Sequence, residues 1–315
     1  MYFPYLRGRQ FELIALRELS EYKLLGPHII PIVEPVKLSS TLCMAIESYA
    51  ANEQPIALIH NPTVGSFMSD MGDENKEKNR MRFSALMGNP RVIKAHQMNP
   101  YSSMQLVTLE SEGVRKQDIF VLNTNRESLD IYEKEFAVIM PRYTFIPDES
   151  VFRRKVRRQR VLIDDKFNKK GKNAEYQETD DEFFSDDHLY YRDDGFLGFA
   201  DYSVIGDEYL EKGFAPYAVA IHIVYFADDE SLRIHHFVSD SNEDATNPAG
   251  KFYEALKKLA AWCKIHPIDH SMGLSTFLEH YANGTYPGLG TVKKLSIMHH
   301  LEIIGKYLSR KEDAG

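Results

Sequence analysis

Residues 56–62 read IALIHNP and residues 160–166 read RVLIDDK, and each is a short apolar run that ends in polar or charged side chains. Fully apolar runs are typical of parallel strands that are covered on both faces. Charged groups at the carboxyl ends of such strands are where α/β folds place ligand chemistry. The unit occurs eight times, which predicts a closed barrel. The runs are IIPIVEP (29–35), IALIHNP (56–62), RVIKAH (91–96), DIFVLNTN (118–125), FAVIMPR (136–142), RVLIDDK (160–166), GFLGFAD (195–201) and YAVAIHIVYF (217–226).

Segments with helical periodicity separate these runs, and a short strand is expected before them at Tyr2–Leu6. Strands that alternate with helices imply right-handed βαβ crossovers and a parallel sheet. A β-sandwich would instead show apolar and polar residues alternating within each strand. The sequence therefore predicts an α/β fold with a (β/α)8 TIM-barrel-like architecture. The clearest helical segments lie at 40–50, 101–111, 127–135 and 148–158.

Three later segments depart from this rhythm. Residues 166–194 form a long polar stretch whose aromatic residues argue against simple disorder, so we expect an ordered lid or insertion there. Only a short helix fits in 203–216, and residues 227–240 are expected to form a hairpin with the eighth run. Residues 248–315 are expected to be a mainly helical carboxyl-terminal extension. With no linker or internal repeat, we expect one elaborated domain over 1–315.

Composition narrows the functional classes. With 43% hydrophobic and 27% charged residues, the 36.3 kDa chain is an ordinary globular protein with a substantial core. A formal net charge of −8 argues against a generally basic nucleic-acid binder, although a local basic stripe stays open. Cys43 and Cys263 lack metal-ligand or redox spacing and are expected to be free thiols. We see no secretory signal and no membrane-spanning run, so we expect a cytoplasmic protein.

The strongest candidates for catalysis follow the sixth to eighth runs. Asp164 and Asp165 cannot both face the barrel axis while the strand stays extended, so one is expected to face the site and the other to cap the next turn. Asp201 ends the seventh run, where it serves either the site or a helix N-terminus. His222 lies among apolar residues, either as a core histidine or facing the axis as an acid or base. The predicted catalytic residues are Asp165, Asp201 and His222.

Acidic side chains at strand ends would suit Mg²⁺ or Mn²⁺, which prefer oxygen ligands. Glu34, Asp165 and Asp201 are the expected ligands, although no spacing signature supports them. His235 and His236 are consecutive in the expected hairpin, so one faces inward and the other outward. Neither forms a zinc signature, because no paired spacing with a third ligand is present.

Basic and amide side chains supply candidates for substrate binding. Arg7 and Arg9 flank Gly8, which allows close backbone approach to an anion; exposed charges in a turn are the alternative. The run RRKVRRQR at 153–160 is expected to be one solvated helix face. The predicted substrate-binding residues are Arg7, Arg9, His60, Asn61, Asn123, Arg142, Ser203 and His236. The chain has no phosphate-binding GxxxxGK[ST], strand-linked GxGxxG, GxSxG or HExxH motif.

Longer stretches resemble a known group. The opening PYLRGRQFELIALREL, followed by IIPIVEP, resembles the uncharacterised bacterial and phage proteins called the "beta family". The strings GFADYSVIGDEYLEKGFAPYAVAIHIVYF and IHHFVSDSNEDATNPAGKFYEAL look like one subgroup of it. The resemblance implies a barrel fold and a role in anti-phage defence, and it supplies no catalytic residues.

Two functions from different classes follow. The first is a metal-assisted hydrolase that acts on a phosphorylated or nucleotide-like substrate in bacterial defence. In it Asp165 and Asp201 hold a metal or activate water, His222 transfers a proton, and Arg7 and Arg142 hold the phosphate. The second is a non-catalytic barrel that binds a protein partner or a small signalling molecule. A nuclease-associated scaffold is a third possibility, and failure to bind nucleic acid even at low salt would count against it.

Overall fold

The computed structural model describes residues 1–210 and 216–313, and the chain divides into two compact units. Unit 1 comprises Met1–Leu13, Pro27–Asp164 and Tyr190–Asp201. Unit 2 comprises Ile14–Gly26, Asp165–Leu189 and Tyr202–Gly315. Residues 211–215, within the short helix expected at 203–216, and residues 314–315 lie outside the described part of the chain.

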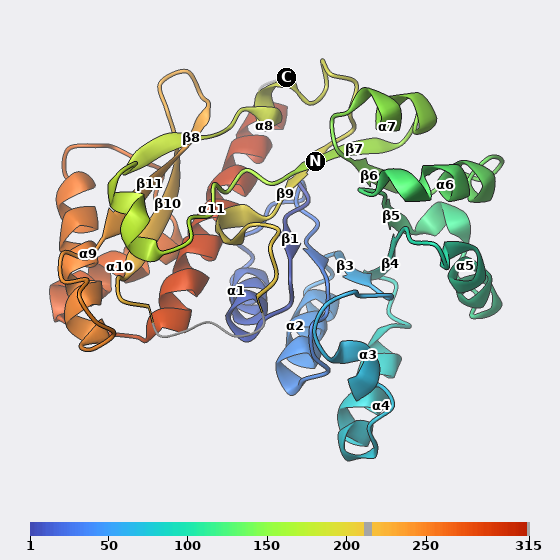
Figure 1. The fold of residues 1–315 in the computed structure, drawn as a ribbon, viewed down its shortest axis with the longest axis horizontal. Helices are drawn as coiled ribbons and strands as arrows, with labels where there is room; N and C mark the ends of the chain where they lie inside the picture. Colours follow the sequence, from blue (N-terminus) through green and yellow to red (C-terminus); the bar gives the residue numbers. More distant parts are fainter. Residues whose placement is uncertain (211–215, 314–315) are drawn as a thin grey trace. The chain divides into compact units, whose positions relative to one another are not determined.

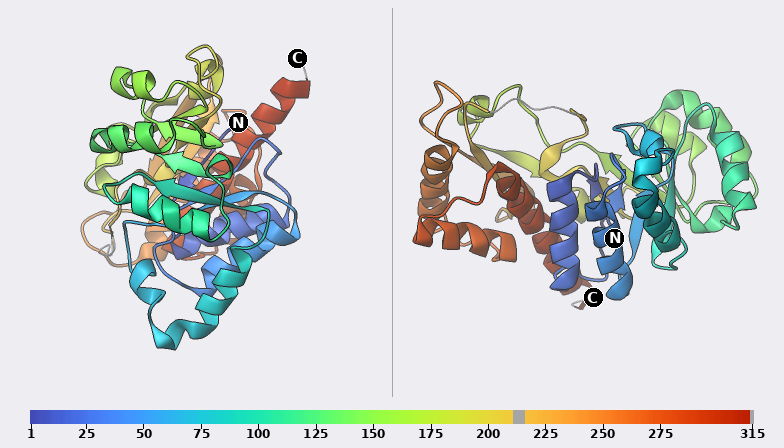
Figure 2. Two further views of the ribbon diagram at one scale, coloured as in Figure 1. Left: turned by 90° about the vertical axis from the view of Figure 1, so that its right-hand side faces the viewer. Right: turned by 90° about the horizontal axis from the view of Figure 1, so that it is seen from below.

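Unit 1 is a nearly closed barrel of eight parallel strands with helices outside it (Figures 1 and 2). Each strand pairs with the next in parallel register, and a bridge between Tyr2 and Phe199 joins the two ends of the sheet. The (β/α)8 TIM-barrel-like prediction is therefore confirmed. In sheet order the strands are β1 (Tyr5–Leu6), β2 (Ile32–Val33), β3 (Ile56–Ile59), β4 (Val92–Gln97), β5 (Phe120–Leu122), β6 (Tyr143–Ile146), β7 (Arg160–Asp164) and β9 (Phe199–Asp201).

The helical segments predicted at 40–50, 101–111, 127–135 and 148–158 form as four of the crossover helices, the last of them shorter than predicted. Ser39 caps one of them, because its hydroxyl accepts the Leu42 N–H at 3.2 Å. The helices are α1 (Gln10–Glu21), α2 (Ser40–Ala51), α3 (Phe67–Asp70), α4 (Glu77–Leu86), α5 (Ser102–Ser111), α6 (Leu129–Glu135) and α7 (Ser150–Lys155). Short 3₁₀ turns are η1 (Glu74–Lys76), η2 (Lys116–Asp118) and η3 (Arg126–Ser128).

Aromatic side chains fill the barrel interior. The Phe3 ring meets those of Phe120, Tyr143 and Phe145 edge-on, with centroids 5.1–5.7 Å apart. Because side chains alternate along a strand, Tyr5 shares the inward face of Phe3. Thr144 points the other way, since its hydroxyl bonds to Tyr132 on α6 at 2.9 Å. Inward and outward faces are thereby fixed for β1, β5 and β6.

Two predicted strand assignments are wrong. The run at 136–142 is no strand: Val138 is 91% exposed, and β6 begins only at Tyr143, after Pro141. The run at 217–226 is not the eighth barrel strand, because β10 (Ala220–Phe226) pairs antiparallel with β11 (Leu232–Val238). The short strand at the amino terminus takes the place in the barrel, as β1. The expected hairpin after the eighth run is confirmed.

Unit 2 is a three-stranded antiparallel sheet packed between helices. Its strand order is β10–β11–β8, and β8 (Asp181–Ser185) comes from the expected lid, so that segment is ordered. On one face, Trp262 stacks on His235 and meets the edge of Tyr225. On the other face, His299 donates to the Val224 carbonyl at 2.7 Å. The remaining elements are η4 (Asn173–Gln177), α8 (Asp187–Tyr190), η5 (Ser203–Ile205), α9 (Pro248–Trp262), α10 (Met272–Asn283) and α11 (Leu289–Asp313).

The carboxyl-terminal region is mainly helical as predicted, since α9, α10 and α11 occupy most of it (Figure 1). In the described ranges, no helix combines the length and apolar character that crossing a membrane requires.

Candidate functional site

The carboxyl ends of the first barrel strands carry a buried polar cluster, which we call the barrel-mouth network. Glu34 is fully buried and pairs with the Arg7 guanidinium. Its carboxylate also accepts the Tyr5 hydroxyl at 2.6 Å and the Thr63 N–H at 2.8 Å. Gln97 donates to the Tyr5 oxygen at 2.8 Å. The network ties β1, β2 and β4 together inside the barrel mouth.

This network leaves little scope for the predicted metal site. Arg7 already supplies a positive charge at Glu34, and a divalent ion there would face that guanidinium. Asp165 accepts the N–H groups of Phe167 at 3.0 Å and Asp207 at 2.9 Å. Among the residues that the structure describes, no three His, Cys, Asp or Glu side chains are grouped to hold a metal ion. Glu34, Asp165 and Asp201 therefore do not fit the predicted Mg²⁺ or Mn²⁺ site.

The two predicted aspartates of the later strands lie in different settings. Asp201 is buried, and its carboxylate accepts the Tyr2 hydroxyl at 2.8 Å. Burial raises the pKa of the Asp165 carboxyl to about 6, assisted by the neighbouring Asp207 carboxylate. The predicted turn-capping role fits Asp165, because it accepts the N–H two residues ahead. Asp164 pairs in register with Asp201 and is exposed.

The predicted pairing of Arg7 and Arg142 on one phosphate is wrong. Arg7 follows β1, at the carboxyl end of the parallel strands, whereas Arg142 precedes β6, at their amino end. Arg142 lies over the Phe120 ring, with its guanidinium carbon 5.8 Å from the ring centroid. Its misplacement follows from reading 136–142 as a strand. The backbone N–H of Arg9 caps the start of α1 by donating to Glu12 at 3.4 Å.

Asn123, just past β5, differs from the other buried polar residues at the strand ends in its side-chain hydrogen bonding. It is fully buried, yet neither its amide nitrogen nor its amide oxygen has a partner among the described residues. Its backbone N–H continues the ladder by donating to the Phe145 carbonyl at 2.9 Å. Such an amide carries a desolvation cost without a compensating hydrogen bond.

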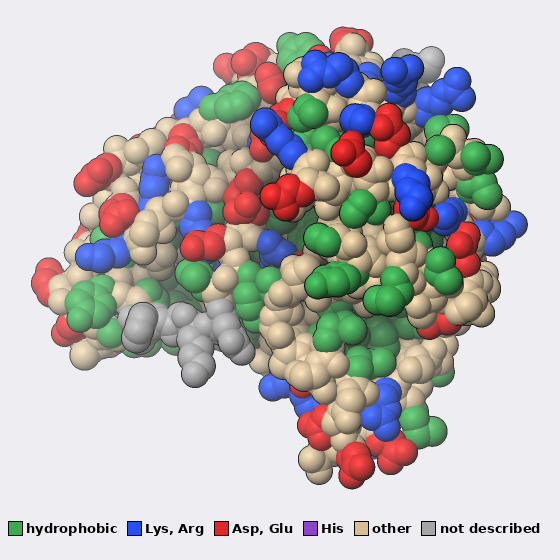
Figure 3. Space-filling model, turned by 45° about the vertical axis from the view of Figure 1, so that its right-hand side comes forward, with side chains coloured by type: hydrophobic (Ala, Val, Ile, Leu, Met, Phe, Trp, Pro, Cys, Tyr) green, Lys and Arg blue, Asp and Glu red, His purple; other side chains and the backbone are tan. Residues whose placement is uncertain are grey.

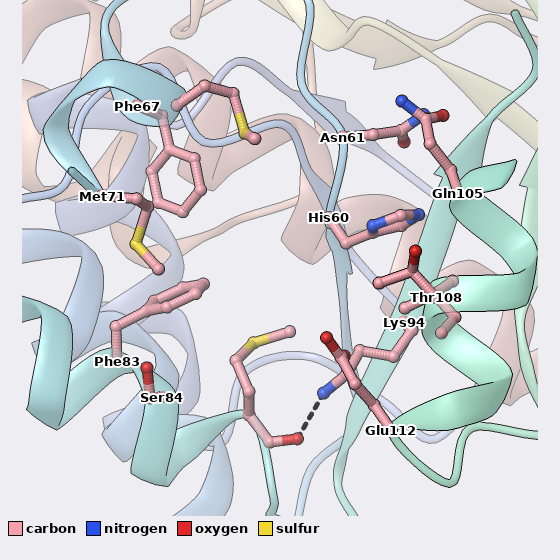
Figure 4. Close-up of a pocket in the computed structure, with 13 residues that line it drawn as sticks. His60, Asn61, Phe67, Met71, Phe83, Ser84, Lys94, Gln105, Thr108 and Glu112 are labelled. Atoms are coloured by element: carbon pink, nitrogen blue, oxygen red, sulfur yellow. Dashed lines mark hydrogen bonds between the residues drawn. The ribbon is translucent and has the colours of Figure 1, made fainter. Parts of the chain in front are cut away.

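Unit 1 has a cleft of about 540 Å³ between α3–α4 on one side and, on the other, the residues just past β3, Lys94 on β4 and one face of α5 (Figure 4). We call it the unit 1 cleft. One wall is apolar, with thioethers and phenyl rings from α3, α4 and the turn after α4. The opposite wall carries the polar side chains. The lining residues are Phe67, Met68, Met71, Phe83, Ser84 and Met87 on one side and His60, Asn61, Lys94, Gln105, Thr108, Leu109 and Glu112 on the other.

His60 enters the cleft as the end of a hydrogen-bonded chain. Its Nε2 lies 2.7 Å from Nδ1 of His96, whose Nε2 lies 2.8 Å from the Ser102 hydroxyl. Burial, and secondarily the charge of Lys94, lowers the pKa of His60 to about 4. Burial also lowers the pKa of His96 to about 3, so both rings are neutral at neutral pH.

The hydrogen bonds of Ser102 determine which ring nitrogen of each histidine in this chain carries the proton. The fully buried Ser102 oxygen already accepts the Asn99 N–H at 2.8 Å, so its own proton needs an acceptor. Nε2 of His96 provides that acceptor, which places the His96 proton on Nδ1 and directs it to Nε2 of His60. The reverse arrangement would leave the buried hydroxyl proton unpaired, at a cost of about 1–3 kcal/mol. His60 therefore carries its proton on Nδ1, which has no partner among the described residues.

Lys94 supplies a second donor on the same wall. Its ammonium group donates to the Met87 carbonyl (Figure 4), and burial lowers its pKa while the Glu112 carboxylate opposes that shift. An ammonium group has three protons, so the Met87 carbonyl leaves donor capacity for a ligand. Glu112 itself is exposed on the rim.

Exposed apolar side chains lie on the helices that border the cleft. Met68 on α3 lines the cleft and is 58% exposed; on α5, Met104 and Val107, which are chain neighbours of lining residues, are 66% and 62% exposed. Figure 3 shows hydrophobic side chains gathered in and around a hollow on this side of the molecule.

Asn61 is less available than His60 or Lys94 for binding a ligand, because its side chain donates to the Gln97 carbonyl and to Gln105 and accepts the Gln97 N–H. It fixes the loop after β3.

Three other predicted residues lie in unit 2. His222 and His236 share a face of the β10–β11 hairpin, and their Nδ1 atoms are 2.7 Å apart. His235 faces the opposite side, so the predicted inward–outward division of the two histidines is confirmed. The Ser203 hydroxyl is buried against Nδ1 of His300 at 2.9 Å. Because β10 is no barrel strand, the prediction that His222 faces the barrel axis is wrong.

Sequence reasoning missed Lys94, Ser102 and the apolar wall of the cleft. A signal was present: Lys94 and His96 are two residues apart in one strand and so must share a face. Nothing in the sequence marked 67–87 as the opposite wall, because that segment has no strand-end signature. No protein-family model matches this chain, and neither does any curated protein or solved structure.

Proposed function

We propose that this protein is a small-molecule-binding α/β barrel and that its ligand, an amphipathic anion, occupies the unit 1 cleft. The observation that carries the proposal is the pairing of two donors, His60 and Lys94, with an apolar wall across the same cleft. Pockets of roughly 300–1,000 Å³ that are mostly apolar and hold a few convergent polar groups are the usual form of small-molecule sites.

The polar wall selects for an acceptor. His60 is neutral and presents Nδ1–H, while Lys94 keeps donor capacity beyond its bond to the Met87 carbonyl. Buried donors that lack an acceptor are costly, so a carboxylate, phosphate or sulfonate is the ligand group that satisfies both.

The apolar wall favours a ligand whose remaining part, beyond the anionic group, is apolar. Phe67 and Phe83 meet edge-on with ring centroids 5.2 Å apart, and methionines flank them. Thioethers and aromatic edges are adaptable surfaces for rings and alkyl chains. The ligand is therefore expected to have an apolar body next to its anionic group.

The hydrolase that the sequence predicts has less support than this binding function. It required Asp165, Asp201 and His222 to meet at one barrel axis, and His222 lies on β10, outside the barrel. A non-catalytic barrel that binds a protein partner or a small signalling molecule is the alternative function that the sequence predicts, and the lining of the unit 1 cleft supports its small-molecule form.

Binding of 8-anilinonaphthalene-1-sulfonate, an aromatic anion, tests the proposal by fluorescence titration of the folded protein. We expect saturable binding that Lys94→Met weakens about 10–100-fold, because a hydrogen bond to a charged group contributes about 1.5–3 kcal/mol. Ser84→Trp should abolish binding, because Ser84 is exposed and lines the cleft.

Ala85→Trp is the matched control, since Ala85 is the exposed neighbour on α4 that does not line the cleft. Equal affinity in the Ser84 and Ala85 variants would place the probe elsewhere and refute the assignment. The melting temperatures of all variants report whether each one is folded.

A further inference from the structure

A second pair of hydrogen-bonded histidines lies in unit 2. The pair in the unit 1 cleft ends in a hydrogen-bond donor, whereas this pair ends in an acceptor. Nδ1 of His222 lies 2.7 Å from Nδ1 of His236, and Nε2 of His236 lies 3.2 Å from the Glu182 carboxylate on β8. Glu182, His236 and His222 therefore form a continuous chain across β8, β11 and β10.

The chemistry of the chain fixes where its protons lie. A carboxylate can only accept hydrogen bonds. Nε2 of His236 therefore carries a proton and donates a hydrogen bond to Glu182. Burial lowers the pKa of both histidines, so each ring holds a single proton at neutral pH. Nδ1 of His236 is then an acceptor, His222 donates to it from Nδ1, and Nε2 of His222 is left as a lone pair.

Aromatic rings hold this arrangement in place. Tyr176 on η4 packs against both imidazoles, with centroids 4.8 Å from His222 and 4.6 Å from His236. Phe167 meets the His222 ring edge-on at 5.1 Å. Both rings belong to the segment between β7 and β8, which orients the histidines.

His222 lines a cavity of about 150 Å³, which we call the unit 2 cavity. Lys293 and Ser296 on α11 and Asn173 on η4 also line it. Burial, then His236 and then the charge of Lys293 lower the pKa of His222, and the His222 and Lys293 side chains line the same cavity. At roughly 30 Å³ per water, the cavity holds about five water volumes. That space suits a tetrahedral oxyanion of five non-hydrogen atoms.

We propose that the unit 2 cavity binds an oxyanion that carries a proton, of which inorganic phosphate is the simplest, with Lys293 neutralising its charge and Nε2 of His222 accepting its proton. The acceptor is what gives the site its selectivity. Sulfate has the same shape and no proton at neutral pH, so it would leave Nε2 facing a bare oxygen. Sites with a buried group that a ligand leaves unpaired reject that ligand strongly.

Titration calorimetry of the full chain with inorganic phosphate and with sulfate at neutral pH tests the proposal. We expect phosphate to bind and sulfate to bind at least about tenfold more weakly, or not at all. Lys293→Met should remove phosphate binding. His222→Gln should bring the two affinities together, because the glutamine amide can donate as well as accept. His266→Gln, a histidine exposed at the end of α9, should leave both affinities unchanged.

Failure of wild-type protein to bind phosphate, or equal affinity for the two anions, would overturn the proposal. So would phosphate binding that survives both Lys293→Met and His222→Gln. If His222→Gln does not fold, the Lys293 variant and the phosphate–sulfate comparison still decide. Binding of the fluorescent sulfonate in the unit 1 cleft should not respond to these variants, which separates this proposal from the first.

Discussion

At the scale of single residues, the buried polar groups of the barrel divide into those that are fully satisfied and those that are not. Glu34 has four hydrogen bonds from three residues, Tyr5, Arg7 and Thr63. Asn123 has none from its side chain within the described residues. The sequence predicted both positions as strand-end polar residues. It could not distinguish them, because their partners come from elements far away in the chain.

Removing the charge of Glu34 should be strongly destabilising. Glu34→Gln leaves the Arg7 guanidinium without its carboxylate, and breaking a buried pair in this way costs about 3–5 kcal/mol. Urea unfolding measures the loss. The double variant Arg7→Met with Glu34→Gln should recover most of it, since no uncompensated charge remains and the glutamine carbonyl can still accept from Tyr5 and Thr63. A double variant no more stable than Glu34→Gln would show that the network contributes through something other than charge.

Asn123 should behave in the opposite way. Asn123→Leu has a similar shape and removes an amide that is buried without partners, so we expect unfolding stability to stay equal or rise by about 1–2 kcal/mol. The same urea titration measures it. A loss of stability would mean that the amide makes hydrogen bonds in solution, for example to an internal water.

At the scale of elements, apolar runs predicted the strand count of the barrel, while misassigning two runs. The run at 136–142 is as apolar as a strand but lies exposed before Pro141, and the run at 217–226 has the composition of a buried strand in either sheet. A short apolar run predicts that a segment is buried, but it does not predict which sheet the strand joins. The two-residue β1 carries too little pattern to be ranked above β10 from sequence alone.

The loop from β3 to α3 should be the most sensitive connection to a small substitution. Gly65 has φ +75°, and a Cβ there would collide with the Val36 carbonyl. Gly65→Ala should therefore cost about 2–4 kcal/mol, the sum of left-handed strain and overpacking. Gly113→Ala is the control, because Gly113 has φ +86° with nothing within 4 Å of an added Cβ, so only the strain of about 1–2 kcal/mol remains. Equal losses in thermal unfolding would refute the clash.

At the scale of the whole molecule, the protein buries several neutral histidines, and this sets its response to acid. His96, His299 and His300 are fully buried, and burial lowers their pKa values to about 3, 4 and 3. Unfolded histidines take up protons near pH 6.5, so the unfolded state binds more protons than the folded state below that pH. The neutral histidines therefore make their full contribution to the free energy of unfolding above pH 6.5, and this contribution falls as the pH approaches 4.

The Asp165 carboxyl works against this trend by one proton, because its raised pKa of about 6 lets the folded state hold a proton that the unfolded state releases. His60 and His222 also have lowered pKa values, so three histidines less one carboxyl is a lower limit, and the slope should be at least about 3 kcal/mol per pH unit between roughly pH 4 and 6. Urea unfolding across that range measures the slope. Stability that is flat or rises toward acid would contradict the neutral assignment of these histidines.

The barrel, the hairpin at 220–238 and the helical carboxyl-terminal region could be predicted from the sequence, since periodicity and strand-end polarity are local signals. The candidate sites could be predicted only in part. His60, His222 and His236 were singled out, whereas Lys94, Lys293 and the apolar wall of the unit 1 cleft were not. Those residues acquire meaning only through neighbours that the fold brings to them.

The most direct test of the central claim, that the unit 1 cleft is a binding site for a small amphipathic anion, is untargeted mass spectrometry of what copurifies with the protein. Wild-type protein and Ala85→Trp should release the same small molecule on denaturation, with an apolar body and an acidic group. Protein with Ser84→Trp, purified identically and equally folded, should release none of it. An identical set of small molecules from all three proteins would contradict the claim.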